Sequence, residues 1–264
     1  MQRIRSELVF LKAQWQANFA SAMEYRAAFI SQIVGMFLND VVYVAFWIVF
    51  FDRFKEIRGW DVSDILLLNA VVATGYGIAF TFFGNALQLS RLIAQGQLDY
   101  YMALPRGLLL NVLASRMANS ALGDISFGIL TFVLAGRHAP AEIALWLIAS
   151  LLAAVVFVMA FTFFHSLTFW LGNAAGLAEQ AMNAMLTFAM YPSEIFQGVV
   201  RFMMFTLLPA AFVGLVPLNA VRFLDANSLA LLALGAAVIS LVSGLTFYAG
   251  LRRYESGSAI NVNV

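Results

Sequence analysis

The segment Ile143–Phe164, IALWLIASLLAAVVFVMAFTFF, contains no charged residue, and Ser150 and Thr162 are its only hydroxyl-bearing side chains. The hydrocarbon core of a bilayer is about 30 Å thick, so a helix needs about 20 apolar residues to cross it. A stretch of this length and composition predicts a transmembrane helix.

The composition of the whole chain extends this interpretation to the entire protein. Of its 264 residues, 62% are hydrophobic and 11% are charged, with a mean hydropathy of +0.86, whereas soluble domains are roughly half apolar and a quarter charged. The net charge of +1 offers no basic surface for nucleic acid. Cysteine is absent, which excludes disulfides and cysteine nucleophiles. We therefore expect an integral membrane protein in contact with lipid, and no partner of nucleic acid.

The sequence carries no recognisable catalytic or nucleotide-binding motif. His138 and His165 form no HExxH pattern, and no GxSxG nucleophile elbow occurs. Neither of the two lysines, Lys12 and Lys55, follows a glycine, so the GxxxxGK[ST] phosphate loop is missing. We predict no catalytic residue, no metal site and no cofactor bound by this chain itself.

Six apolar segments have the length of a membrane span or approach it. They are residues 27–51, 65–89, 117–136, 143–164, 177–190 and 229–251. Residues 90–116 are too mixed in polarity to cross a bilayer, and Tyr191–Pro192 ends the short fifth segment. The predicted fold is an all-α integral membrane domain over residues 1–264, with six transmembrane helices.

Residues 1–26 predict an amphipathic helix that lies along the membrane surface. Ile4, Leu8, Leu11, Trp15 and Phe19 recur at steps of three and four, and polar or basic residues fill the other positions. Basic residues and a tryptophan beside an apolar stripe are typical of interfacial helices. A helix packed on the cytosolic face of the protein is the alternative.

Residues 194–227 decide the topology. Their apolar part, residues 202–221, contains Pro209, Gly214 and Pro217, and such breaks at membrane depth are tolerated where protein or a wet cavity satisfies the backbone. We interpret residues 194–227 as a re-entrant pair of half-helices on the outer side. The alternative is a kinked seventh span, which would place the termini on opposite faces.

The distribution of basic residues favours six spans. With both termini cytosolic, nine of the 15 lysines and arginines lie inside, as the positive-inside rule expects. A seventh span would move Arg252 and Arg253 outside and leave seven inside.

Three acidic residues lie within predicted spans. Asp40, next to Asn39, is near the middle of the first span, Asp124 is in the third, and Glu179 is near the start of the fifth. A charged aspartate at the bilayer centre costs about 2.5–3.5 kcal/mol, so each should face the bundle or a wet cavity. Asn39, Asp40 and Asp124 are therefore candidates for lining a transport path. Hydrogen-bonded structural contacts between helices, with Asp40 protonated, are the alternative.

Two stretches carry more information than hydrophobicity. Residues 92–99 read LIAQGQLD and continue to Leu104–Pro105, and residues 191–196 read YPSEIF. Together with the tail LRRYES at residues 251–256, they resemble the permease subunit of a bacterial type-two ABC exporter. The similar branch has separate permease and ATPase chains and shares an IxxGxLDxxLxxP loop, from which this chain departs at Met102–Ala103, where leucines are common.

The resemblance implies roles for both stretches. Residues 90–116 would hold a coupling helix that fits a groove on the ATPase, and the N-terminal helix would be a connecting helix against that ATPase. The coupling residues would be Ile93, Gly96, Leu98, Asp99 and Pro105. The outer gate would contain Tyr191, Pro192, Glu194, Phe196, Arg201, Pro209 and Pro217.

The resemblance also implies a function, partners and a location. Two permease chains, identical or similar, would pair with two cytosolic ABC ATPase subunits that bind ATP and magnesium. The complex would export a hydrophobic or cationic compound, such as a drug or a viologen-like molecule, across the bacterial cytoplasmic (inner) membrane. The alternatives are an ATP-independent secondary carrier or channel and a non-transporting membrane anchor.

Overall fold

The computed structural model describes residues 2–255, apart from the side chains of residues 2–4 and 194. The longer helices are α1 (Gln2–Glu24), α2 (Arg26–Phe54), α3 (Val62–Phe83), α7 (Ala121–Leu134), α8 (Pro140–Ser166), α10 (Ala175–Ala189) and α13 (Ala226–Leu251). The shorter helices are α4 (Leu89–Ala94), α5 (Leu98–Met102), α6 (Leu108–Ala114), α9 (Thr168–Leu171), α11 (Gly198–Phe205) and α12 (Leu215–Arg222), with 3-10 turns η1 (Gly84–Gln88), η2 (Ser193–Ile195) and η3 (Ala210–Phe212). No strand occurs within residues 2–255 beyond an isolated bridge between Ile57 and Trp60.

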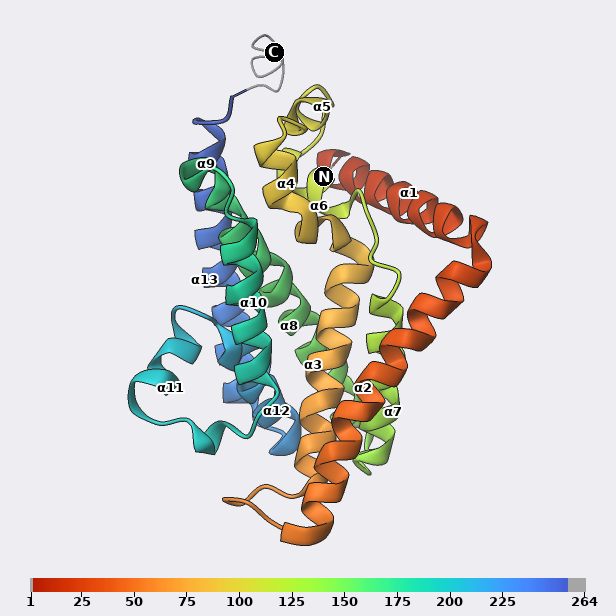
Figure 1. Ribbon diagram of the computed structural model, residues 1–264, viewed down its shortest axis with the longest axis vertical. Helices are drawn as coiled ribbons and strands as arrows, with labels where there is room; N and C mark the ends of the chain where they lie inside the picture. The colour runs from red at the N-terminus through yellow and green to blue at the C-terminus, as the bar shows by residue number, and fades with distance from the viewer. Residues whose placement is uncertain (1, 256–264) are drawn as a thin grey trace.

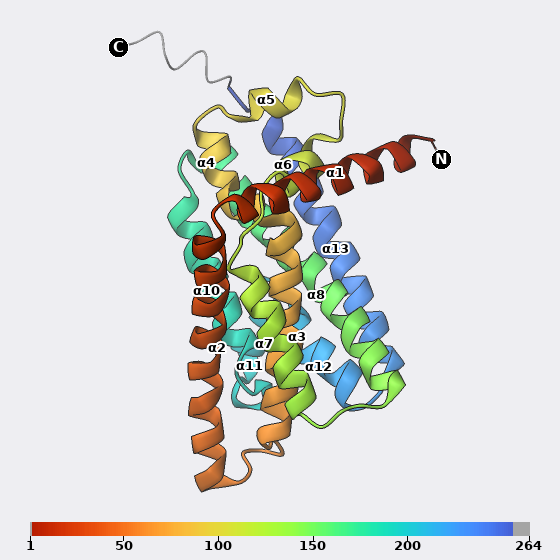
Figure 2. The same ribbon diagram turned by 90° about the vertical axis from the view of Figure 1, so that its right-hand side faces the viewer.

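The helices form one bundle with a helical cap at one end. Helices α2, α3, α7, α8, α10 and α13 lie roughly parallel to the long axis (Figure 1). Helix α1 crosses the end of the bundle beside α4, α5 and α6, where α13 also ends (Figure 2). The loop between α2 and α3 lies at the opposite end, together with α12 (Figure 1). We call these the cap end and the loop end.

The lengths of the helices confirm an all-α, multi-pass membrane fold. Four helical segments are long and apolar enough to cross a bilayer: α2, α3 with its continuation to Ala94, α8 with its continuation to Leu171, and α13. Helix α11 and residues 210–222 would make a fifth if counted together, but they bend by 63° at their break. Helices α7 and α10 have 14 and 15 residues, or roughly 21–23 Å at 1.5 Å per residue. The predicted number of six spans stays a prediction.

Helix α3 is the centre of the bundle. Within its most apolar window 83% of the residues are buried inside the protein, against 17% for α2 and 22% for α13. Glycines allow α7 to approach it closely: a Cβ added to Gly77 would lie 2.7 Å from the carbonyl oxygen of Ala121, and one added to Gly128 would collide with Thr74. Small residues at such crossings let helix backbones pack directly against each other in membranes.

The predicted span 65–89 is not one continuous α-helix. Helix α3 ends at Phe83, and η1 takes the chain from Gly84 to Gln88 before α4 begins. The amide of Asn85 donates to the carbonyl oxygen of Val112 at 2.8 Å and to the hydroxyl of Ser115 at 2.7 Å. These contacts with the end of α6 draw the chain into a tighter turn. No pattern within residues 65–89 could have predicted them.

An ion pair joins three loops at the loop end. The guanidinium of Arg222 lies 2.7 Å from the carboxylate of Asp64 and donates to the carbonyl oxygen of Gly59 at 2.9 Å. Arg137 donates to the carbonyl oxygen of Arg222 at 3.1 Å and pairs with Glu142 at 3.2 Å. Arg137 and Arg222, which the predicted six-span topology places on the outer side of the membrane, therefore each pair with an acidic residue.

We expect Gly77→Ala to destabilise the protein, because the added methyl group meets the backbone of α7. Overpacking of this kind costs about 1–3 kcal/mol, so the midpoint of thermal unfolding in detergent should fall. Gly35→Ala, in α2, is the matched control, since nothing lies within 4 Å of an added Cβ there. Equal unfolding midpoints for the two variants would contradict the close packing of α3 on α7.

We expect Arg222→Ala to cost about 2–3 kcal/mol, because it leaves the buried Asp64 carboxylate without its partner. Adding Asp64→Asn to the same chain removes the orphaned charge and should recover part of the loss. Thermal unfolding of the two single variants and the double variant measures this coupling. Strictly additive losses would show that the ion pair does not join these loops.

Candidate functional site

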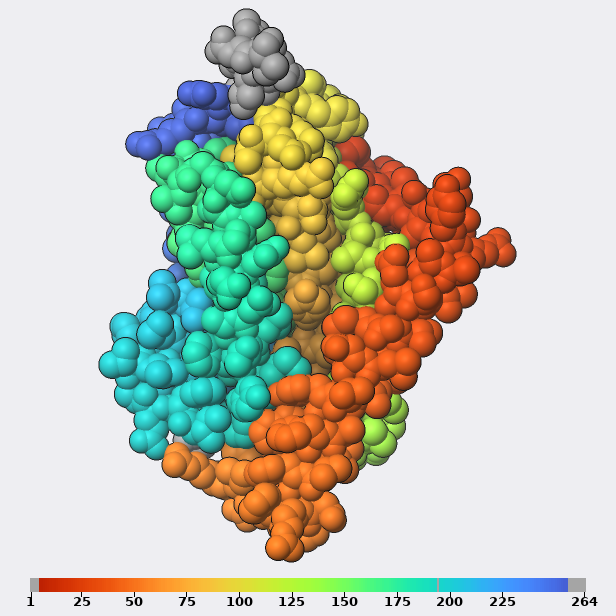
Figure 3. Space-filling view, viewed as in Figure 1, coloured from red at the N-terminus to blue at the C-terminus, as the bar shows by residue number. Residues whose placement is uncertain are grey.

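A polar cavity lies between α2, α3, α7 and α10, inside the bundle. It has a volume of about 250 Å³. Its polar residues are Asn39, Asp40, Tyr43, Asn69, Tyr76 and Asp124, and the other lining side chains are apolar. Figure 3 shows α3 at the bottom of a hollow between α2 and α10. The three candidates for path lining, Asn39, Asp40 and Asp124, thus meet at one cavity, although they come from α2 and α7.

The two acidic groups of the cavity are buried and poorly partnered. Asp40 is 8% exposed and Asp124 is 5% exposed. One carboxylate oxygen of each has no hydrogen-bond partner among the described residues. The side chain of Asn39 hydrogen-bonds Asp40, and the two carboxyl groups are close enough for their charges to interact. The cavity therefore has a concentrated negative potential when either group is ionised.

Sequence reasoning missed three polar residues of this cavity. Asn69 is 1% exposed, and its amide nitrogen donates to the carbonyl oxygen of Ile65 at 2.8 Å. The hydroxyl of Tyr43 donates to the carbonyl oxygen of Met190 at 2.9 Å and so joins α2 to the end of α10. Tyr76 packs on Phe80, with 4.5 Å between ring centroids. The one available signal was Asn69, the only amide side chain within α3.

The segment predicted to couple to an ATPase forms α4 and α5 in the cap. Ile93, Gly96 and Leu98 are buried. Gly96 has φ +68°, a left-handed conformation that favours glycine, and Leu98 donates its N–H to the hydroxyl of Tyr254 at 3.1 Å. These predicted coupling residues hold the segment in shape and do not form its surface.

The remaining predicted coupling residues are more accessible. Asp99 is half-buried and lies in the first turn of α5, whose N-cap residue is Gln97. Burial and the neighbouring charge of Asp99 raise the pKa of the Tyr254 hydroxyl. Pro105 is exposed. The exposed side chains of α5 itself are Tyr100, 68% exposed, and Met102, 44% exposed.

Internal hydrogen bonds attach the cap to the bundle. The hydroxyl of Ser90 and Nδ1 of His165 are 2.6 Å apart, which joins α4 to the end of α8. Helix α1 is held by its polar side chains: Trp15 donates to the carbonyl oxygen of Phe82 at 2.8 Å, and Asn18 donates to that of Ala114 at 3.1 Å. Leu8 on the same helix remains 61% exposed. Helix α1 thus packs on the cap and also presents an apolar surface.

The residues predicted to form an outer gate are spread over the segment between α10 and α13. Tyr191 packs on Trp47 of α2, with 5.6 Å between ring centroids, and Phe196 packs on Phe188 at 5.2 Å. Pro192, Pro209 and Pro217 are buried, and Arg201 is exposed. The side chain of Glu194 lies outside the described part of the structure. The structure therefore connects the start of this segment to α2, close to the polar cavity.

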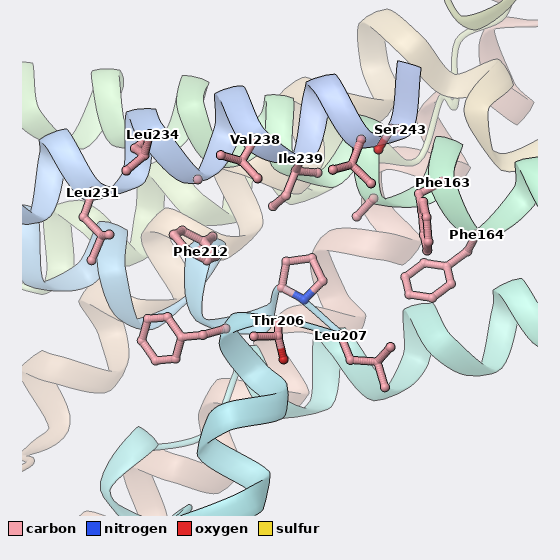
Figure 4. A pocket seen from close by; sticks show the side chains of 15 residues that line it. Phe163, Phe164, Thr206, Leu207, Phe212, Leu231, Leu234, Val238, Ile239 and Ser243 are labelled. Atoms are coloured by element: carbon pink, nitrogen blue, oxygen red, sulfur yellow. The ribbon is translucent and has the colours of Figure 1, made fainter. Parts of the chain in front are cut away.

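An apolar groove of about 390 Å³ lies beside the same segment, between α8 and α13. Figure 4 shows Phe163 and Phe164 on one side, Leu231, Leu234 and Val238 along α13, and Phe212 between them. Its two hydroxyl groups are already used: Ser243 donates to Met159 at 2.7 Å and Thr206 donates to Phe202 at 2.9 Å, both to carbonyl oxygens. The groove suits hydrocarbon, whereas the cavity suits a polar or charged group.

Metal chemistry has no obvious location within residues 2–255. No group of three histidine, cysteine, aspartate or glutamate residues there is arranged to hold a metal ion. The chemistry that the described residues offer is the binding of groups with positive charge in the cavity and of apolar groups in the groove.

Comparison with known proteins identifies a family. Residues 37–258 match the family described as ABC-2 family transporter protein. No curated protein and no solved structure gave a significant match. The matched region contains the residues that line the polar cavity apart from Met36, α4 to α6 of the cap and the whole segment between α10 and α13. The resemblance to a type-two ABC permease is confirmed, and this chain belongs to the ABC-2 family of ABC transporter membrane proteins.

Proposed function

We propose that the chain is the permease subunit of an ABC exporter, which moves a hydrophobic or cationic compound while separate cytosolic ATPase subunits hydrolyse ATP. The observation that carries the proposal is the family match over residues 37–258, since membership implies association with ABC ATPase subunits. A second permease chain, identical or similar, completes the path. Drug-like and viologen-like molecules belong to the proposed class of cargo.

The proposed topology has six spans in the bacterial cytoplasmic membrane, with the cap in the cytosol. Helices α7 and α10 are the short spans, and the flexible thickness of a bilayer accommodates such mismatch. Helices α11 and α12 both lie in the half of the molecule toward the loop end (Figures 1 and 2). Their position supports a re-entrant outer segment over a seventh span, and it leaves both termini on the cytosolic side.

The cap has two sets of residues with different tasks in coupling. Ile93, Gly96 and Leu98 are buried and set the angle between α4 and α5. Tyr100 and Met102 are exposed on α5, and exposed aromatic and methionine side chains are the types enriched where proteins bind each other. The exposed set contacts the ATPase, and the buried set transmits its movement to α3 and α8.

The buried acidic groups are the one observation that favours an ATP-independent carrier. Asp40 and Asp124 lie within the bundle, and intramembrane carboxyl groups mark proton relays in pumps and transporters. A carrier of this kind would move its solute in liposomes without a P-loop ATPase. An ABC exporter requires that ATPase, so reconstitution of the chain alone separates the two functions.

We expect Tyr100→Ala with Met102→Ala to reduce retention of the ATPase by more than tenfold during purification. The tagged chain is purified from its native membrane in mild detergent, and the bound P-loop ATPase is quantified by mass spectrometry. Phe54→Ala is the control, because Phe54 is a 59% exposed aromatic residue at the loop end. Equal retention by all chains would contradict the contact, and a wild-type chain that transports without any ATPase would contradict the proposed function.

We expect Leu98→Ala and Asp99→Ala to uncouple transport from ATP hydrolysis. Leu98 is fully buried, and its truncation loosens the packing of α5 near Tyr254, which follows α13. The reconstituted complex should then still hydrolyse ATP while substrate movement falls. Transport and hydrolysis that decline in the same proportion would show that this segment supports assembly only.

A further inference from the structure

The polar cavity contains two acidic side chains that no basic side chain of its lining can neutralise. Among the described residues that line it there is no lysine, arginine or histidine. Asp40 and Asp124 each leave one carboxylate oxygen without a hydrogen bond. An unpaired carboxylate is costly in an apolar environment, and a cation or a proton must compensate it.

A third unpartnered oxygen lines the same cavity. Asn69 is only 1% exposed, yet its Oδ1 atom has no hydrogen-bond partner in the described part of the chain. The amide nitrogen of Asn69 already donates to the carbonyl oxygen of Ile65, and the hydroxyl of Tyr43 already donates to that of Met190. The free polar atoms contributed by Asp40, Asp124 and Asn69 are therefore oxygens that attract positive charge and accept hydrogen bonds.

Aromatic rings line the same cavity as these oxygens. Tyr43, Tyr76 and Phe127 line the cavity. Neighbouring rings fix two of them: Tyr76 lies 5.5 Å from Phe157, and Phe127 lies 6.0 Å from Phe37, between ring centroids. Aromatic faces attract organic cations, and quaternary ammonium groups are commonly bound in this way.

The size and the lining of the cavity favour an organic cation over a metal ion. A volume of about 250 Å³ is several times the roughly 30 Å³ of a water molecule. Within residues 2–255 no three acidic or histidine side chains converge as metal ligands. Met36 and Met190 also line the cavity, and methionine adapts to irregular apolar shapes.

We propose that the cavity between α2, α3, α7 and α10 binds an organic ammonium cation. Asp40 and Asp124 neutralise its charge, Asn69 accepts a hydrogen bond where the cation has a donor, and the tyrosine rings pack on its apolar groups. That this cation is the cargo rests on the proposed export function, whereas its binding does not. The apolar groove beside α13 lacks charged residues and receives no charged group.

Equilibrium binding to the purified full-length chain in detergent tests the proposal. The probe is radiolabelled benzyltrimethylammonium, and the competitors are tetraethylammonium, benzyl alcohol and sodium chloride. Tetraethylammonium keeps the charge and should displace the probe. Benzyl alcohol keeps the ring without the charge, and at the same concentration it should displace less than one-tenth as much. Sodium chloride at that concentration should leave the probe bound.

Isosteric variants locate the site. Asp40→Asn and Asp124→Asn each remove one charge and should weaken binding of the probe by at least tenfold. Glu179→Gln is the matched control, because Glu179 is an exposed acid on α10 outside the cavity. Asp40→Glu and Asp124→Glu restore the charge and should bind more tightly than the amides. The comparison of competitors on the wild-type chain needs no variant, so a poorly folding variant leaves the test intact.

Each result supports or overturns the assignment. Displacement by benzyl alcohol as strong as that by tetraethylammonium would reduce the cavity to an apolar site, and displacement by sodium would make it an inorganic cation site. Unchanged affinity in both aspartate variants would place the probe elsewhere. The assay contains no ATP and no ATPase, so absence of an ATPase partner overturns the exporter function alone, whereas lost cation selectivity overturns the cavity assignment alone.

Discussion

The close contact of α7 with its two neighbours is the constraint on which the polar cavity depends. Gly128 lies against the backbone of α3 at Thr74, and Gly123 lies against α2, where an added Cβ would be 3.0 Å from the backbone nitrogen of Phe37. Because both faces of α7 are this thin, Asp124 is held between α2 and α3, beside Asp40 and Asn69. A larger residue at Gly123 would push α7 away from α2 and so move Asp124 away from Asp40. A larger residue at Gly128 would push α7 away from α3 and so move Asp124 away from Asn69.

The short motif of residues 92–105 is connected to the bundle by contacts within the cap. Gly96 lets the chain turn between α4 and α5, the Tyr254 hydroxyl receives the N–H of Leu98, and Ser90 contacts His165 at the end of α8. The motif residues therefore connect α3, α8 and the end of α13. Hydrogen bonds and packed side chains that do not involve α1 therefore link α5 to these three helices.

Hydropathy predicted the long helices because each of α2, α8 and α13 contains its own signal, an apolar run of spanning length. It could not predict the break at Gly84, whose cause is the contact of Asn85 with Val112 and Ser115. The position of Asp40 and Asp124 within apolar helices could be predicted for the same local reason. Their proximity to Asn69 could not be predicted, since it depends on the crossing of three helices that are distant in sequence.

Contacts made by the segment that follows α10 border the polar cavity. The Tyr43 hydroxyl bonds to Met190, and the next residue, Tyr191, packs on Trp47 of α2. Helix α2 has little else to hold it on this side, since only 17% of its apolar window is buried. Any separation of α2 from the end of α10 must break the bond between Tyr43 and Met190. The residues that follow α10 thereby hold α2 beside the cavity that Asp40 and Asp124 line.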